Sequence, residues 1–569
     1  MQAFLQSIGY QHWILNVLLL LPMLGVVLVL VAPERWARWL TLVVATAEFV
    51  LALGLWWAFD SAMGGMQFTT SLPWLPEFGI HYRIGLDGLS LFMILLATAM
   101  MPLLVWGSWF AIDTKVRGYY ALLLALKTGM IGVFVAMDLF LFYCFWELLL
   151  IPMYFLIGTW GSANRLYAAT KFVVYTFAGS VMMLVAIIAM VVLVGKGTGE
   201  YSFAYDHLVQ NRDLLAPWAP YLFTAFALAF AVKVPIFPLH TWLPDAHVEA
   251  PTGGSVILAA VLLKFGTYGF IRFALPFFPL AARDAAPLIS VLAVIGIVYG
   301  ALMAYVQDDA KKLVAYSSVS HLGFVVLGIL TLNPQGVQGG LYQMLGHGIS
   351  TGGLFLAVGL LYDRRHTRRL SDFGGLWKQM PTFAACFLII VLASVGLPGL
   401  CGFVGEFLVL IGTFTAYNGW RAAGMAGYFP APKLMGAISA TAVILAAMYL
   451  LTMYQKLMFG PLDKAENRTV RDIRGRETWV FGIVVVAALV MGVFPQPILS
   501  RSEKSVDAFI TGYRDRLQDA RKAPDAPAHV YPALPPAATG PAPAAPPAAP
   551  APGAAAPPPP ALPPGGMAR

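Results

Sequence analysis

Apolar residues occur along most of this chain in continuous runs of about twenty residues. A run of this length lets a helix cross the hydrocarbon core of a bilayer. The pattern therefore predicts an all-α polytopic membrane protein with about fourteen transmembrane helices. We place them at 13–31, 38–59, 86–110, 118–136, 138–159, 168–195, 219–246, 253–277, 287–306, 311–331, 340–361, 382–415, 434–459 and 477–496. A polar loop, 60–83, is expected between the second and the third, and the long run 168–195 is expected to tilt or break.

Proline and glycine interrupt two of these runs, 219–246 and 382–415, and predict broken helices there. Each broken helix is the fourth member of a group of five. Because five is odd, the groups 118–277 and 287–459 predict two inverted repeats, with a functional site at their interface. The flanking parts are the N-terminal helices, 1–117, and a last transmembrane helix, 477–500.

The remaining segment, 501–569, changes in composition. Residues 503–522 are rich in charge and predict an amphipathic helix. From Ala523 the chain is mostly Pro and Ala, and such a segment cannot bury a core. We expect a disordered tail rich in polyproline II structure.

Composition excludes a water-soluble globular protein. Of 569 residues, 59% are hydrophobic and only 11% are charged, whereas soluble domains carry roughly 25% charged residues. The net charge of +8 lies mainly in short loops, so it indicates orientation and not nucleic-acid binding. Most loop Lys and Arg lie on one side, which the positive-inside rule places in the cytoplasm; an even number of helices then places both termini outside.

The stretch 231–247, AVKVPIFPLHTWLPDAH, combines ionisable groups with three prolines inside a predicted helix. Its ionisable residues are Lys233, His240, Asp245 and His247. A lysine at membrane depth costs about 2.5–3.5 kcal/mol on insertion scales, so we interpret Lys233 as functional. The alternative is an interfacial lysine whose amine reaches the headgroups.

Other ionisable residues are sparse in the apolar runs. A desolvated lysine loses its proton more easily, and a nearby carboxylate helps it to keep that proton. Glu147 beside Lys233 would therefore form a switchable pair, and histidines would pass protons onward. The predicted proton pathway comprises Glu147, Lys233, Lys264, His321, His347 and Glu406, with Lys127, His240, Asp245 and Lys312 as accessory residues.

Structural alternatives stay open for these residues. Each histidine could be a satisfied core residue, and Glu147 could be a packing partner of Trp or Ser side chains. Asp308, Asp309, Lys311 and Lys312 lie at a predicted helix junction, where we expect either solvated side chains or a gate. The three cysteines are scattered and show neither metal-ligand nor disulfide spacing, and no motif binds a metal or cofactor.

Four motifs resemble a known family. They are FWELLLIPMYFLIGTWG, VKVPIFPLHTWLPDAHVEAPTGGSVILAAVLLKFGTYG, KKLVAYSSVSHLGF and LPGLCGFVGEF. Over about residues 1–500 the chain is similar to the antiporter-like subunits of proton-pumping NADH:quinone oxidoreductase, respiratory complex I. The family's key residues fall on the six pathway residues named above.

Within that family the chain most resembles subunit M, called chain 4 in mitochondria. Subunits L and N typically carry lysine where Glu406 stands, and no C-terminal lateral helix like that of subunit L can follow residue 500. Two features depart from the family pattern. Lys127 stands where many relatives have an acid, and the Pro/Ala tail is not a family feature.

The resemblance implies a proton-translocating subunit that binds no cofactor itself. NADH, FMN, iron–sulfur clusters and quinone would lie in other subunits. The implied partners are the other membrane subunits, especially L, N and the lateral helix of L, together with the lipid of a bacterial inner membrane. One alternative is a subunit of an Mrp-type cation/proton antiporter or a membrane hydrogenase. Another, of a different class, is a non-conducting membrane scaffold.

Deletion of the tail from Ala523 onward should leave proton pumping unchanged, because this segment has too few large apolar side chains with which to dock. Proton uptake by membrane vesicles containing the full complex measures this. Loss of pumping in a complex that still assembles would contradict the prediction.

Overall fold

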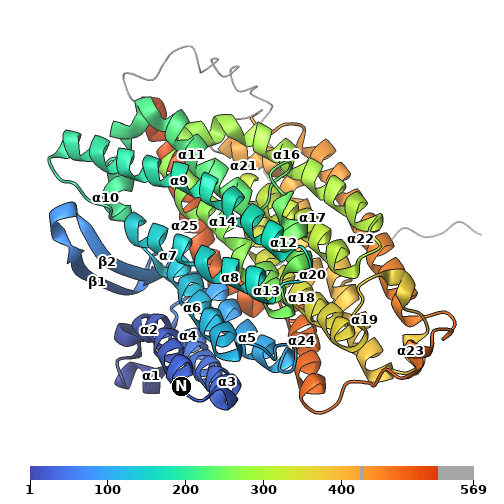
Figure 1. Cartoon of the computed structure of the whole chain (residues 1–569). Coiled ribbons are helices and arrows are strands. Elements are labelled where there is room, and N and C mark those ends of the chain that lie inside the picture. Colours follow the sequence, from blue (N-terminus) through green and yellow to red (C-terminus); the bar gives the residue numbers. More distant parts are fainter. Residues whose placement is uncertain (423–427, 523–569) are drawn as a thin grey trace, which may run out of the picture. The chain divides into compact units, whose positions relative to one another are not determined.

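A computed structural model describes residues 1–422 and 428–522 of the chain (Figure 1). The Pro/Ala tail predicted from Ala523 lies outside the described residues. Within the described part, twelve helices or helix runs are long and apolar enough to cross a membrane. Three further apolar helices, α5, α19 and α20, are shorter. Helices occupy all the predicted apolar runs, to within a few residues at most ends.

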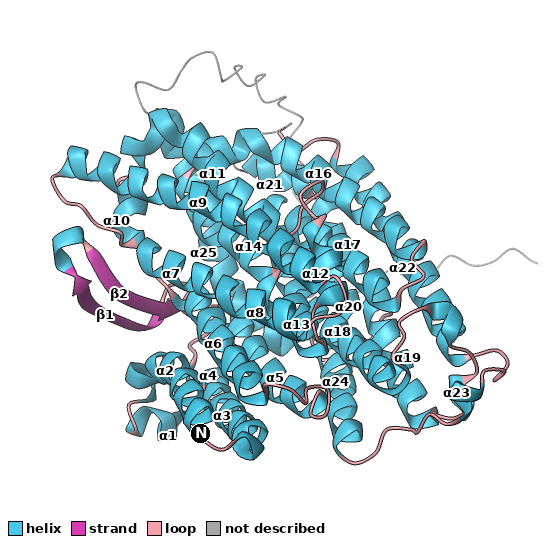
Figure 2. Ribbon diagram, viewed as in Figure 1, coloured by secondary structure: helices cyan, strands magenta, loops and turns pink. Residues whose placement is uncertain are grey.

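The N-terminal part contains α1 (Gln2–Ser7), α2 (Tyr10–Val31), α3 (Glu34–Leu53), α4 (Leu55–Ala58), α5 (Leu91–Gly107) and α6 (Val116–Val135). The prediction that 60–83 is a polar loop is partly wrong. It holds an antiparallel hairpin of β1 (Gln67–Leu75) and β2 (Ile80–Leu86), joined by η1 (Pro76–Phe78) and drawn in magenta in Figure 2. The hairpin packs against α7 through Trp74 and Phe140, whose rings lie 6.1 Å apart.

The middle part runs from α7 to α15. Its elements are α7 (Leu139–Leu148), α8 (Leu150–Trp160), α9 (Arg165–Thr198), α10 (Tyr205–Gln210), η2 (Arg212–Trp218), α11 (Ala219–Lys233), α12 (Trp242–Glu249), α13 (Thr252–Ile257), η3 (Leu258–Leu262), α14 (Lys264–Gly269), η4 (Phe270–Ala274) and α15 (Leu275–Phe277). The long predicted run 168–195 lies in α9, which is continuous. Both η3 and η4 are π-helical, and they flank the helix that Lys264 begins.

The C-terminal part starts with α16 (Pro279–Tyr305). It continues with α17 (Ala310–Leu330), α18 (Pro334–Arg365), η5 (Leu370–Asp372), η6 (Leu376–Lys378), α19 (Pro381–Val395), α20 (Cys401–Phe414), α21 (Ala416–Ala422), α22 (Pro432–Met458), α23 (Ala465–Arg468), α24 (Arg476–Val493) and α25 (Gln496–Lys522). The predicted amphipathic helix is confirmed as part of α25, which buries Val506, Ile510, Tyr513 and Leu517.

The two predicted breaks are present. The first separates α11 from α12, and the indole Nε1 of Trp242 donates to the carbonyl of Val232 at 2.9 Å. This bond satisfies a carbonyl next to the break, as a membrane interior requires. The second separates α19 from α20, where Gly396 (φ 85°) and Gly399 (φ 90°) adopt left-handed conformations that favour glycine.

The helices differ in how much of their surface the bundle covers. The run from α13 to α15 is completely buried, and α17 and α18 are almost so, whereas α2, α3 and α24 leave most of their surface open. Lys264, His321 and His347 therefore lie on the central helices, away from surrounding lipid.

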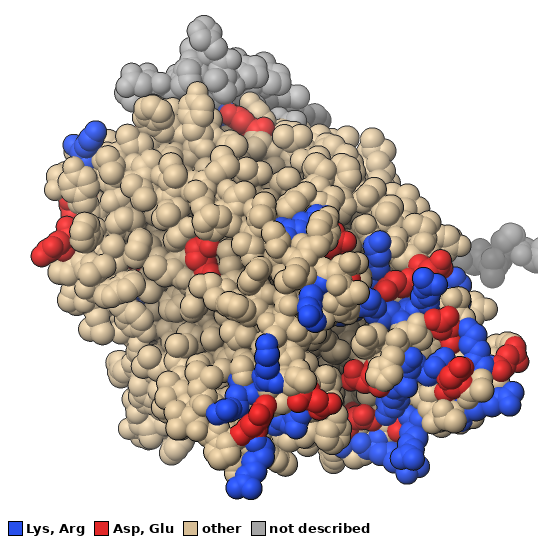
Figure 3. Space-filling view, viewed as in Figure 1, with Lys and Arg blue, Asp and Glu red and all other residues tan. Residues whose placement is uncertain are grey.

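The start of α2 and the start of α25 contact the same part of the bundle, around α4. Tyr10 donates through its hydroxyl to the carbonyl of Leu51, just before α4. Arg501 of α25 donates to the carbonyl of Trp56 in α4. Charged side chains gather at another end, where Figure 1 labels α19, α23 and α24 (Figure 3). The Arg364–Glu477 ion pair, 2.7 Å, links two helices at this charged end.

A loop carboxylate anchors α19 at the charged end. Asp472 accepts hydrogen bonds from the backbone N–H groups of Thr382 (2.9 Å) and Phe383 (3.0 Å). Partial burial acts to raise the pKa of Asp472, but these bonds outweigh it and hold the pKa below its usual value. The stabilisation is thus fully present above about pH 4 and is lost as the pH falls through the lowered pKa.

Asp472→Asn should speed amide exchange at Thr382 and Phe383 at pH 7, because the helix start loses a charged acceptor. Hydrogen exchange followed by mass spectrometry measures this. Asp463→Asn, in an exposed loop position nearby, is the matched control and should change nothing. Equal exchange in the Asp472 variant and the parent would show that the carboxylate does not hold this end.

Candidate functional site

The second broken helix carries a buried carboxylate with two polar neighbours. Glu406 lies on α20, shortly after the break. Its Oε1 is 2.9 Å from Nδ1 of His321 on α17, and it accepts a hydrogen bond of 3.0 Å from Nε2 of Gln343 on α18. All three side chains are buried. Three helices thus converge on one carboxylate oxygen.

A lysine–histidine pair continues this cluster. Nζ of Lys264 lies 2.7 Å from Nδ1 of His347 and donates at 2.5 Å to the carbonyl of Ala259, inside the π-helical segment η3. The rings of His347 and His321 have centroids 5.6 Å apart. The structure therefore brings together Lys264, His347, His321 and Glu406 in that spatial order. Our sequence-based row placed His321 before His347, because sequence order does not reveal which helices are neighbours.

Lys233 occupies a different environment. Its amine is buried at the end of α11 and lies over the rings of Trp146 (5.2 Å) and Phe172 (5.7 Å). Among the described residues it makes no hydrogen bond. Attraction to the aromatic faces stabilises the charged form of the amine by roughly 0.5–2 kcal/mol. Trp146 thus contacts the lysine amine in addition to the ring of Phe230.

Glu147 is near Lys233 without contacting it directly. It lies at the end of α7, partly exposed, and its Oε1 is buried without a hydrogen bond among the described residues. Its charge acts on Lys233 electrostatically, but no ion pair within 4.0 Å joins them in the described part of the chain. The two residues that we predicted to be a switchable pair thus have no direct ion pair, and Trp146, directly before Glu147 in the sequence, contacts the Lys233 amine.

Lys127 has a partner that we did not predict. Its Nζ lies 2.8 Å from Oε2 of Glu48 on α3, and both side chains are fully buried. Glu48 was overlooked, although a lone acid in the middle of the apolar run 38–59 carries the same desolvation cost as the lysine. Gln343 was also missed, since a neutral amide in an apolar run gives little signal.

Two of the accessory residues, His240 and Asp245, lie in the first break and in the helix that follows it. His240 is buried against the rings of Phe237 and Tyr299. Asp245 is partly exposed and pairs with Lys171 at 2.7 Å. The structure thus places both apart from the Lys264–Glu406 row, and neither contacts it by a described hydrogen bond.

The side chains at the predicted helix junction, 308–312, are not all exposed to solvent. Lys312 is partly exposed, and its backbone N–H donates to Asp309. Lys311, in contrast, is buried and donates to the carbonyl of Ala250. It lines a cavity of about 140 Å³ together with Asp363, Arg368 and others.

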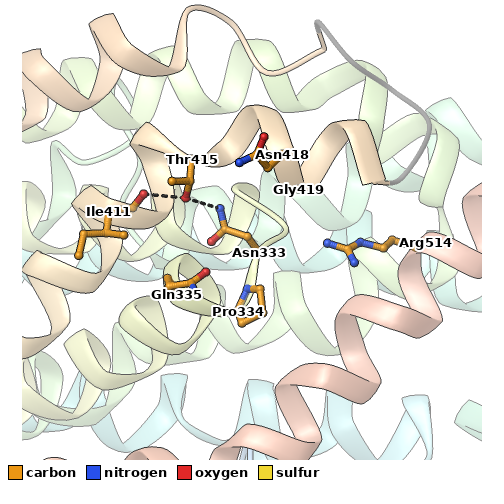
Figure 4. A pocket seen from close by; sticks show the side chains of 8 residues that line it. All are labelled: Asn333, Pro334, Gln335, Ile411, Thr415, Asn418, Gly419 and Arg514. Atoms are coloured by element: carbon orange, nitrogen blue, oxygen red, sulfur yellow. Dashed lines mark hydrogen bonds between the residues drawn. The ribbon is translucent and has the colours of Figure 1, made fainter. Parts of the chain in front are cut away.

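Another pocket of about 330 Å³ lies at the opposite end of α18 and α20 (Figure 4). Its polar lining includes Asn333, Gln335, Thr415 and Arg514. Nδ2 of Asn333 donates to Thr415 at 3.3 Å and to the carbonyl of Gly412 at 2.7 Å. Gly412 and Glu406 lie on the same helix, α20.

A family profile described as "NADH:quinone oxidoreductase/Mrp antiporter, TM" matches residues 136–429. NADH-quinone oxidoreductase subunit M of Rhodobacter capsulatus is 44% identical over 492 residues, which cover 85% of this chain and 93% of the relative. The chain belongs to the subunit M family of NADH:quinone oxidoreductase. It is a proton-translocating membrane subunit of respiratory complex I, in the chain 4 group.

Solved structures agree with this assignment. A chain of respiratory complex I from Thermus thermophilus has a TM-score of 0.78 and 35% identity, covering 88% of this chain and 99% of that one. A chain of the Mrp complex from Dietzia has a TM-score of 0.74 at 20% identity, covering 89% and 99%, which shows a shared fold alone. The resemblance inferred from the four motifs is confirmed. Subunit M is a multi-pass membrane subunit without redox centres, and no cluster of metal-binding side chains occurs within the described ranges.

Glu48→Gln should destabilise the subunit by about 3–5 kcal/mol, because it leaves the buried Lys127 charge unpaired. The double variant Glu48→Met/Lys127→Met should recover most of that loss, since it removes both charges. Thermal aggregation of the purified complex and the yield of assembled subunit measure this. Equal loss in the single and the double variant would show that the pair is not an isolated ionic contact.

Proposed function

We propose that subunit M moves protons along the buried row Lys264, His347, His321 and Glu406, supplied by the Glu147–Lys233 pair. The observation that carries the proposal is the contact geometry of this row. Lys264 and His347 are 2.7 Å apart, His321 and Glu406 are 2.9 Å apart, and the two histidine rings lie between them with their centroids 5.6 Å apart.

Electrostatics gives the row a direction. Lys264, His347 and His321 become cationic when protonated, and like charges at such short range repel strongly in a low-dielectric interior. Two adjacent protons are therefore unfavourable in the row, whereas the Glu406 carboxylate attracts one. A proton that reaches Lys264 lowers its free energy by moving toward Glu406.

Lys233 supplies the switch. With Glu147 close to it, the ammonium ion is stabilised; with the carboxylate withdrawn, only aromatic rings contact the amine. Helix α11, which ends at Lys233, packs against α14, which starts at Lys264. Movement of Glu147 relative to Lys233 would thus favour release of the proton toward Lys264. We expect electron transfer from NADH through FMN and iron–sulfur clusters to quinone, in other subunits, to drive that movement.

The proposal includes a topology of fourteen crossings. Helix α5 and the joined pair α19–α20 would add two to the twelve longer spans. Residues 118–277 and 287–459 would form inverted repeats, each with one break. Tyr10, near the N-terminus, and Arg501, after the last span, both contact the segment around α4. Their position on the same side supports an even number of crossings, with both termini in the periplasm of a bacterial inner membrane.

Access to the row would come from the two ends of the bundle. The cavity beside Lys311 opens near the basic end, which the positive-inside rule places in the cytoplasm. The pocket lined by Asn333 and Arg514 lies beyond Glu406 at the other end. We infer uptake at the first and release at the second.

Neighbouring subunits and lipid would cover the outer helices. Helices α2, α3 and α9 leave large apolar side chains open, among them Val31, Val43 and Val185. Such surfaces suit either acyl chains or the helices of a membrane partner. We propose that subunits L and N and the lateral helix of L are those partners.

Glu406→Gln should reduce proton translocation at least about tenfold, and coupled quinone reduction with it, because the nearly isosteric amide cannot carry the proton. Reconstituted complexes with a pH-sensitive dye measure translocation. Glu466→Gln, on α23, makes the same change at an exposed site and is the matched control. Near-normal pumping by Glu406→Gln would overturn the assignment of Glu406 and leave His347 as the better release group. Near-normal pumping by Lys264 and Lys233 variants as well would support a non-conducting scaffold.

A further inference from the structure

The two oxygens of the Glu406 carboxylate have different surroundings. Oε1 faces both Nδ1 of His321 and Nε2 of Gln343. Oε2 points to the backbone of the break, since a Cβ added at Gly396 would lie only 2.7 Å from it. The left-handed glycine (φ 85°) therefore leaves room for this oxygen. The carboxylate has one defined orientation, with Oε1 toward the histidine.

Packing holds Gln343 in its place. A Cβ added at Gly405 would lie 2.7 Å from the Cα and the backbone N of Gln343. Helices α18 and α20 thus approach closely at the residue directly before Glu406. Gln343 itself is only 1% exposed. Because the two backbones are in contact here and the side chain is buried, the Cα of Gln343 is fixed close to the carboxylate and little space is left for its amide to turn away.

From these contacts we propose that Gln343 is a positioning residue for proton transfer from His321 to Glu406. The inference rests on the proposed pathway through Glu406. The amide of Gln343 holds Oε1 against Nδ1 of His321 and prevents rotation of the carboxylate about its terminal bond. A hydrogen bond to an ionised acceptor contributes more than one between neutral groups, so it suits this restraint.

The amide can serve both protonation states of the carboxylate. In the transfer step the Nδ1–H bond of His321 breaks and an O–H bond forms at Oε1 of Glu406, which leaves both side chains neutral. Oε1 of Gln343 is buried and has no hydrogen bond among the described residues. Rotation of the amide by half a turn presents this acceptor to the new O–H group. A side chain that offers both a donor and an acceptor is needed for this role.

The test compares Gln343→Met with Gln338→Met in the assembled complex. Methionine keeps the unbranched shape of glutamine but removes both the donor and the acceptor. Gln338 lies on the same helix and donates to the carbonyl of Leu499, so it controls for a change in helix packing. We expect Gln343→Met to lower proton translocation about tenfold and Gln338→Met to leave it within about twofold, since only the first variant loses a hydrogen bond to a charged group.

Infrared difference spectroscopy supplies a readout that a merely structural role would not change. The carboxyl band that disappears in Glu406→Gln is the signal of Glu406. This band should shift in Gln343→Met and should stay unchanged in Gln338→Met. Gln343→Glu, which keeps the side-chain volume, is the second variant and should shift the band as well, even if the methionine variant fails to assemble.

The outcomes distinguish the role of Gln343 from the pathway through Glu406. An unchanged band and normal pumping in the Gln343 variants, with pumping lost in Glu406→Gln, overturn the role of Gln343 alone. Normal pumping in Glu406→Gln overturns the pathway itself. A shifted band with reduced pumping in the Gln343 variants, and neither change in Gln338→Met, is the expected result.

Discussion

The cost of placing an ionisable group in a hydrocarbon interior is the constraint on which this structure depends. An unpaired charge at such depth is unfavourable by several kcal/mol, so each buried charge requires a partner supplied by the chain. Glu48 neutralises Lys127, and Glu406 lies against His321 and Gln343. Lys233 is the contrasting case, because its amine is surrounded by aromatic rings. A group with so little stabilisation responds most strongly to a charge that approaches or withdraws.

The same constraint explains why the breaks and the π-helical segments lie where they do. A regular helix pairs most of its carbonyls with its own N–H groups four residues further on. The π-helical segment η3 leaves the carbonyl of Ala259 available to Lys264, and the break after α11 leaves that of Val232 to Trp242. Irregular backbone is tolerated at this depth only where protein covers it. The completely buried run α13 to α15 provides that cover.

Sequence reasoning recovered the helices because a run of about twenty apolar residues is a strong signal, and it recovered both breaks because Pro and Gly mark them. It missed the β1–β2 hairpin, since nine and seven residues between two apolar runs give a weak pattern. The six residues of the proposed pathway could be selected by the cost of their charges. Their partners could not, because contacts such as Glu48–Lys127 and Gln343–Glu406 join positions that are 79 and 63 residues apart and depend on how helices pack.

The buried row draws its four members from four different helices, α14, α17, α18 and α20. The last of these enters the membrane only after the other three have been synthesised. No partly inserted chain can therefore contain the whole of the proposed proton route. On the proposed pathway, insertion of the growing chain into an energised membrane therefore does not let protons leak across it. Only the complete bundle would conduct them.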